Sequence, residues 1–179
     1  APRASLVCGD KVATRGHRLR RAIWGAAAAD PRVERFASAV ATTLDRAGGC
    51  RVLGGAPEAK ADAVAPYAVH VAVENVRRPG YFTEKLLDCF LLRTVPVYWG
   101  CPDLAAFGFD VDGVVFIDDA GDVDAVAARA LAGVASALDA PHPRLAAAVE
   151  RNYARAQEFL DLEGRLEGAV REGLESRGV

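Results

Sequence analysis

The side chains best suited to chemistry gather between residues 74 and 85. This stretch combines carboxylates, an amide, a phenol, a hydroxyl and an amine, carried by Glu74, Asn75, Tyr81, Thr83, Glu84 and Lys85. Residues 83–85 are predicted to form the first turn of a helix, whose free N–H groups and positive dipole end attract an anion such as a diphosphate. A lysine in that turn opposes the dipole, so Lys85 favours an anion in front of it.

Two of these side chains suggest the other parts of such a ligand. The carboxylate of Glu84 can accept hydrogen bonds from the paired hydroxyls of a ribose, and Tyr81 can stack on a ring or donate a hydrogen bond to a phosphate. The alternative is that residues 83–85 are only a solvated first turn. Spacing alone does not decide between the two interpretations.

A predicted strand, helix and second strand position these residues. The apolar run at 69–73 predicts a buried strand, and Pro79-Gly80 predicts a turn after it. Apolar residues within 86–91 follow the spacing of a helix face, and residues 94–99 predict the second strand. Such a crossover unit requires parallel strands, and open sheets of this kind bind ligands at the carboxyl ends of their strands. The polar residues lie at that end.

A second strand-loop-helix corner is predicted near the start of the chain. Residues 4–8 predict a short strand, 9–16 a loop and 17–29 a helix. The junction is basic and contains Lys11, Arg15, His17, Arg18, Arg20 and Arg21. This charge either binds phosphate at the carboxyl end of the strand or forms a solvated basic helix end. For His17 a capping or structural role is favoured.

The rest of the chain alternates between short apolar runs and helical patterns. Asp30-Pro31 predicts a helix start, because the apolar residues within 33–44 then share one face. Further on we expect strands at 50–53 and 114–116, a loop or short helix at 56–67, helices at 102–107, 123–138 and 145–160, and a helical tail at 161–179. The order predicts a Rossmann-like three-layer α/β/α sandwich with a mainly parallel sheet, in a single domain over residues 1–179.

The composition is typical of a globular domain. The 179 residues are 51% hydrophobic and 26% charged, which is enough apolar content to bury a full core. A net charge of −2 gives no electrostatic attraction to nucleic acid or to an anionic membrane. No apolar run reaches the length of a membrane span. The lack of methionine suggests a processed or excised piece of a longer product.

Two patterns that could indicate a metal site are better explained otherwise. The D-x-D pairs at 110–112 and 122–124 fall in a turn and at a predicted helix start, where acids suit the dipole, and both lie away from the polar corner. The cysteines show no C-x-x-C spacing, so zinc is not supported, while disulfides are left open. They are Cys8, Cys50, Cys89 and Cys101.

The stretch 71–103 resembles the donor-binding motif of the family 10 glycosyltransferases, the α1,3/α1,4-fucosyltransferases. In that motif an apolar strand ends in Glu-Asn, and a tyrosine, a Thr-Glu-Lys helix start and a Val-Pro-Val/Ile-Tyr-Trp-Gly strand follow. The matching positions are Glu74-Asn75, Tyr81, Thr83-Glu84-Lys85 and residues 95–100. The resemblance covers roughly residues 4–160, weakly in the first half and strongly over 71–103.

The resemblance implies one half of a two-domain, GT-B-type enzyme. In the family an N-terminal domain binds the acceptor and carries the carboxylate base, while a C-terminal domain binds GDP-fucose. This chain matches only the donor half. The implied reaction is inverting, metal-independent transfer of fucose from GDP-fucose to a glycan, with no cofactor required. The acceptor would reach the site through a missing N-terminal domain or a partner chain, and the general base is expected outside this chain.

The resemblance also assigns roles to residues. Lys85 and Arg20 would stabilise charge on the diphosphate. Arg20 is chosen because, in the family, an arginine entering the helix after the first strand contacts the diphosphate. Asn75 and Tyr81 would position phosphate or sugar, and Glu84 would hold the ribose. Weaker candidates for donor binding are Glu74, Thr83, Arg18 and Lys11.

The sequence departs from the family pattern in the loop after Asn75. Val76 stands where many members have a small polar residue, which leaves the sugar contact open, and Arg77-Arg78 adds positive charge. Two alternatives therefore stand beside a fucosyltransferase: a glycosyltransferase using another nucleotide sugar, or a non-catalytic interaction module derived from one. The compartment is left open: cytoplasm for a bacterial or viral protein, Golgi lumen for part of a eukaryotic type II membrane enzyme.

Overall fold

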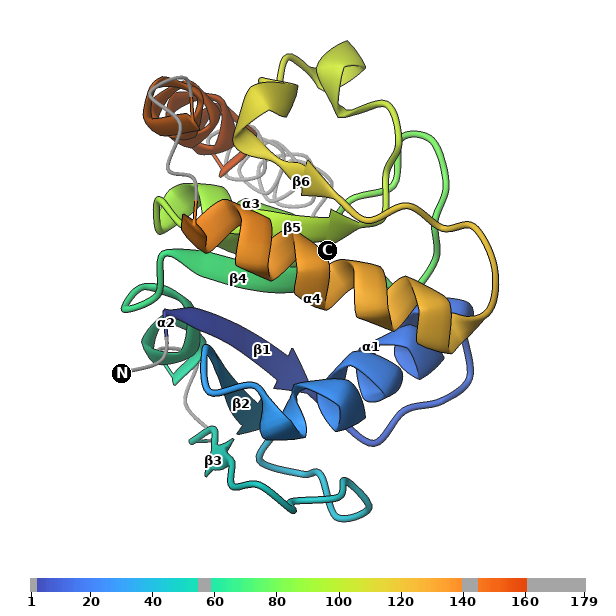
Figure 1. Ribbon diagram of the computed structural model, residues 1–179. Coiled ribbons are helices and arrows are strands. Elements are labelled where there is room, and N and C mark those ends of the chain that lie inside the picture. Colours follow the sequence, from blue (N-terminus) through green and yellow to red (C-terminus); the bar gives the residue numbers. More distant parts are fainter. Residues whose placement is uncertain (1–2, 55–58, 140–144, 161–179) are drawn as a thin grey trace, which may run out of the picture.

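The computed structural model describes residues 3–54, 59–139 and 145–160. A six-stranded sheet runs through it in the order β3-β2-β1-β4-β5-β6, and every pair of neighbouring strands is parallel (Figure 1). The strands are β1 (Ala4–Cys8), β2 (Val33–Ala37), β3 (Arg51–Val52), β4 (Val69–Val73), β5 (Val95–Trp99) and β6 (Val115–Phe116). This is the strand order of the Rossmann fold.

Helices cover both faces of the sheet. The elements are α1 (Arg15–Ala26), η1 (Ala27–Ala29), α2 (Ala59–Val64), α3 (Glu84–Leu91), η2 (Leu104–Phe107), η3 (Val111–Gly113) and α4 (Val123–Asp139), and residues 145–160 are also helical. α1 and α4 lie side by side on one face, while α2 and α3 pack on the other (Figure 1). The predicted three-layer α/β/α sandwich is confirmed.

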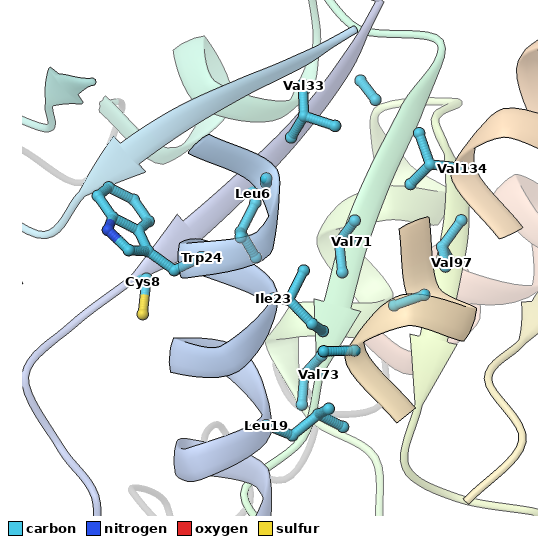
Figure 2. Close-up of a cluster of buried hydrophobic side chains, with 14 of the residues drawn as sticks. Leu6, Cys8, Leu19, Ile23, Trp24, Val33, Val71, Val73, Val97 and Val134 are labelled. Carbon is cyan, nitrogen blue, oxygen red and sulfur yellow. The ribbon is translucent and has the colours of Figure 1, made fainter. Parts of the chain in front are cut away.

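Alternation along the central strands divides the core between the two faces. Val71 and Val73 of β4 pack with α1 and α4, as Figure 2 shows beside Leu19 and Ile23. Ala72, between them, belongs to a second cluster with α3. The central strands are thus buried on both faces, which explains their continuous apolar sequence.

The helix predicted to begin at Asp30-Pro31 is wrong, because this segment contains β2. Residues 33–37 pair in register with β1, and Val40 lies in the following loop with 84% of its surface exposed. The strand pattern is obscured by Arg35, a buried charge whose guanidinium donates to the carbonyls of Trp24 and Gly49. A strand buried on both faces does not alternate, and its apolar spacing then also fits a helix.

The topology places one crevice in the sheet. α1 leaves β1 toward one face, and α3 leaves β4 toward the other, although β1 and β4 are neighbours. Such a switch point opens a crevice at the carboxyl ends of the two strands, where α/β proteins bind ligands. The predicted polar corner lies there.

Other parts of the chain carry structural side chains. The four cysteines are unpaired. Asp110 accepts a hydrogen bond from the N–H of Asp112, and Asp122 accepts one from the N–H of Ala125 at the start of α4. In the described residues there is no group of three or more His, Cys, Asp or Glu side chains that could hold a metal ion, and no helix long and apolar enough to cross a bilayer. The tail predicted at 161–179 lies outside the described residues.

Candidate functional site

A single buried carboxylate, that of Glu74, holds the turn between β4 and α3. Its oxygens accept hydrogen bonds from the backbone N–H of Thr83 at 2.8 Å and from the Thr83 hydroxyl at 2.7 Å. Burial raises the pKa of Glu74, and the Thr83 hydrogen bonds and the Lys85 charge oppose that rise. Because Glu74 is fully buried, it fixes where α3 begins and does not face the crevice.

In the first turn of α3, the ammonium group of Lys85 lies close to three side-chain oxygens. Lys85 Nζ lies 3.0 Å from Thr83 Oγ1, 3.0 Å from Glu84 Oε1 and 3.7 Å from Glu74 Oε2. Thr83 is also the N-cap, since its hydroxyl accepts from the N–H of Lys85 at 3.4 Å. The ammonium is thus held beside the positive end of the helix dipole, an arrangement that favours an anion in front of both.

Glu84 is held in its ionised form between two lysines. Its Oε1 lies 3.0 Å from Lys85 Nζ and 3.5 Å from Lys60 Nζ of α2. Partial burial would raise its pKa, but the Lys85 hydrogen bond and charge, with the Lys60 charge, lower the pKa of Glu84 to about 2. Its side chain is half exposed, so the carboxylate is free to accept hydrogen bonds from a ligand.

Arg20 reaches the same crevice from α1. Its Nη2 donates to the carbonyl of Val73 at 2.8 Å and to Asn75 Oδ1 at 3.1 Å. Its Nε is buried and has no hydrogen-bond partner among the described residues, a cost that a bound anion would remove. Burial also lowers the pKa of Arg20. Arg20 therefore offers an unused donor at the carboxyl ends of β1 and β4.

Close packing of the two corners requires a glycine at position 16. The N–H of Gly16 donates to the carbonyl of Asn75 at 3.1 Å, and a Cβ on Gly16 would lie 1.8 Å from the carbonyl oxygen of Glu74. No other residue fits at that separation. The start of α1 is therefore pressed against the end of β4, which brings Arg20 to Asn75.

The structure brings together six of the nine predicted donor-binding residues: Arg20, Glu74, Asn75, Thr83, Glu84 and Lys85. Tyr81 lies on the same loop with the Arg78 guanidinium 5.6 Å from its ring centre. Arg18 and Lys11 are exposed, and Arg18 donates to the carbonyls of Val12 and Ala13 in the loop before α1. His17 forms a capping box with Thr14, as a capping role predicts.

The structure adds two residues to the site that the sequence interpretation did not assign. Lys60 of α2 and Asp88 of α3 form an ion pair at 3.6 Å, and both line a cavity with Arg20, Glu84 and Lys85. Asp88 lies four residues after Glu84 and thus on the same helix face, a signal present in the sequence. Lys60 carries no such signal, because only the packing of α2 on α3 brings it here.

Comparison with known proteins finds similarity to glycosyltransferases. No family model matches it. Over 46 residues, 26% of this chain, it is 37% identical to the alpha-(1,3)-fucosyltransferase FucT of Helicobacter pylori. The chain is fucosyltransferase-like. The match spans 10% of the length of FucT, so only a small part of that enzyme is compared.

Solved structures show the same fold. A crystal structure of an α1,3-fucosyltransferase gives a TM-score of 0.51 at 24% identity and is covered over 37% of its length by 84% of this chain. The spinosyn rhamnosyltransferase SpnG gives a TM-score of 0.54 at 16% identity, with 90% of this chain and 45% of that one covered. The chain spans less than half of either structure. The predicted likeness to one half of a GT-B glycosyltransferase is confirmed at the level of the fold.

Proposed function

We propose that this chain is the donor-binding half of a fucosyltransferase, which transfers fucose from GDP-fucose to a glycan acceptor with inversion and without a metal. One observation carries the proposal. Arg20 from α1 and Lys85 from α3 line a single cavity at the switch point of the sheet, with the ionised Glu84 beside them. These are the charges that a nucleoside diphosphate requires.

The diphosphate, the ribose and the sugar of the donor each have a candidate partner in this arrangement. The diphosphate would lie against the first turn of α3, between the Lys85 ammonium and Arg20 Nε, which has no partner within the described part of the chain. The ribose hydroxyls would donate to Glu84, whose carboxylate is ionised and half exposed. Asn75 and Tyr81, on the loop between β4 and α3, would contact phosphate or sugar.

These cations would act on the leaving group. In the proposed reaction an acceptor hydroxyl loses its proton to a base and attacks the anomeric carbon of fucose. The bond to the β-phosphate oxygen breaks with its electron pair on GDP. Lys85 and Arg20 would stabilise the charge that grows on the diphosphate, because fixed charges that need no reorganisation stabilise a transition state most effectively.

The general base would come from outside this chain. Glu74, the carboxylate closest to Lys85 apart from Glu84, is fully buried and hydrogen-bonded to Thr83. Glu84 is neutralised by Lys60 and Lys85, and its low pKa makes it a weak base. We therefore place the base and the acceptor site in a facing domain or a partner chain.

Calorimetric titration with GDP, GDP-fucose, UDP and ADP tests the proposal. We expect binding that prefers the guanine nucleotides and weakens at least tenfold in Lys85→Ala, because the diphosphate loses its charge partner. Arg32→Ala serves as the control. Arg32 forms its ion pair with Asp30 just before β2, at the amino end of the sheet, and its removal should leave GDP binding unchanged. A folded chain that binds none of the four nucleotides would rule the proposal out.

A further inference from the structure

The cavity at the switch point is also lined by a second pair of charges, Lys60 and Asp88. It has a volume of about 110 Å3, which is small beside the roughly 300–1,000 Å3 of a typical ligand pocket. A whole nucleotide therefore does not fit inside, and only its flat base is a candidate occupant. Val7 of β1, Val64 of α2 and Ala72 of β4 provide apolar walls, and His70 of β4 also lines the cavity.

This second pair is a donor next to an acceptor, and the donor, Lys60, also lies 3.5 Å from Glu84 Oε1. Lys60 Nζ and Asp88 Oδ2 lie 3.6 Å apart, and both line the cavity. Burial raises the pKa of Asp88 even with Lys60 beside it, so the carboxylate would gain from further N–H donors. The pair thus presents an ammonium and a carboxylate to whatever ring enters.

The spacing of Glu84 and Asp88 along α3 suits a single nucleoside, with its ribose at one acid and its base at the other. Glu84 and Asp88 are four residues apart, so they lie on the same face of α3 about 6 Å apart along its axis. A base attached to a ribose at Glu84 would reach Asp88 if it lay along α3. The apolar walls would then enclose the faces of the ring and leave its edge to the charged pair.

We propose that Lys60 and Asp88 read the edge of a guanine base, with Asp88 accepting from its N1–H and 2-amino group and Lys60 donating to its O6. This inference rests on the proposed function, since the diphosphate and ribose sites orient the base. Adenine presents the reverse pattern, with an amino donor facing Lys60 and a ring acceptor facing Asp88. Uracil offers Asp88 a single N–H donor. Guanine alone of the three matches both charges with two donors to the carboxylate.

Exchange of one carboxylate oxygen for an amide tests this assignment. Asp88→Asn keeps the shape of the side chain but replaces one acceptor with a donor, which suits xanthine, whose C2 carries an oxygen in place of the amino group. Calorimetry with GDP, inosine diphosphate and xanthosine diphosphate should show that the wild type prefers GDP over xanthosine diphosphate by at least tenfold, with inosine diphosphate between them. In Asp88→Asn that preference should reverse. A merely structural role for Asp88 predicts no reversal.

Two further variants complete the test. Asp62→Asn is the matched control, because Asp62 is an exposed acid of α2 that does not line the cavity, and its preference should equal that of the wild type. Lys60→Gln should weaken all three purines together, without a reversal, because each has an oxygen at C6. Equal binding of the three nucleotides by wild type and Asp88→Asn would overturn the inference while leaving the diphosphate site standing. No binding of any nucleotide would overturn the proposed function and the inference with it.

Discussion

The two strand-loop-helix corners at the switch point have the same topology but different local chemistry. At the start of α1, the Thr14 hydroxyl accepts from the N–H of His17 at 3.2 Å, and His17 Nδ1 accepts from the N–H of Thr14 at 3.3 Å. Burial lowers the pKa of His17, which keeps the ring neutral and able to accept. The two hydrogen bonds between Thr14 and His17 thus complete this cap without a ligand.

The start of α3 is organised by charge. The Thr83 hydroxyl is shared between the buried Glu74 and the Lys85 ammonium, and Glu84 is drawn to the same ammonium. A lysine in the first turn and a buried carboxylate both cost free energy in the unliganded protein. From this comparison we propose different roles for the two corners: the first is a structural cap that contributes Arg20, and the second binds the anion.

The largest expected effect comes from forcing the two corners apart. Gly16→Ala would place a Cβ 1.8 Å from the carbonyl oxygen of Glu74, so we expect a loss of roughly 3 kcal/mol or more in the free energy of unfolding. GDP affinity should fall as well, because Arg20 moves away from Asn75. Chemical denaturation and calorimetry measure the two effects.

The control for this change lies in the same helix. A Cβ on Gly25 of α1 meets nothing within 4 Å. Gly25→Ala should therefore stabilise the chain by about 0.5–1 kcal/mol through helix propensity and leave binding intact. Equal stability of the two alanine variants would show that the corners are not in forced contact.

A smaller effect, dependent on pH, comes from the side-chain pair beneath both corners. Ser5 Oγ of β1 and His70 Nδ1 of β4 are buried and 2.7 Å apart, and burial lowers the pKa of His70 from 6.5 to about 4. As the pH falls below 6.5, the unfolded chain takes up a proton that the folded chain does not, so stability declines until the pH reaches about 4. The loss between pH 7 and 4.5 should be about 2–3 kcal/mol.

A variant that does not titrate isolates the contribution of His70. His70→Asn keeps a polar partner for Ser5, so its free energy of unfolding should fall by about 2–3 kcal/mol less than that of the wild type over the same pH range. The raised pKa of Glu74 acts in the opposite direction, but it is common to both proteins and cancels in the difference. Parallel pH profiles for the two proteins would contradict a buried neutral His70.

The smallest effect compares the two caps directly. Thr14→Ala and Thr83→Ala each remove one N-cap and should cost about 1 kcal/mol of stability. Only Thr83→Ala should weaken GDP binding, by about tenfold, because Glu74 and Lys85 lose the hydroxyl that they share. Affinities reduced alike by both substitutions would remove the distinction between a structural and a binding corner.

Much of this arrangement could be predicted from the sequence, because local patterns determine it. The run at 69–73, the turn at Pro79-Gly80 and the helix start at 83–85 each carry a short-range signal, and their order gives parallel strands with polar residues at the carboxyl ends. The D-x-D pairs could be separated from the site because they fall in a turn and at a helix start, and in the structure Asp110 and Asp122 each accept a hydrogen bond from a nearby backbone N–H.

The remainder depends on contacts between distant segments. β2 was predicted as a helix because the buried Arg35 obscures its pattern, and only carbonyls from other segments make that burial tolerable. Lys60 and Asp88 were not assigned, because the packing of α2 on α3 creates their cavity. The burial of Glu74 likewise follows from Thr83, nine residues away, and has no sequence signal of its own.

The most direct test of the central claim is a titration of 15N-labelled protein with GDP, followed by NMR. If the anion lies between the two corners, the largest shifts should fall on the amides of residues 83–85 and on the Arg20 Nε–H group, which has no hydrogen-bond partner in residues 3–54, 59–139 and 145–160. The capping-box amides of Thr14 and His17 should move little. Shifts confined to those capping residues or to the amino end of the sheet, with Lys85 and Arg20 unchanged, would contradict the account.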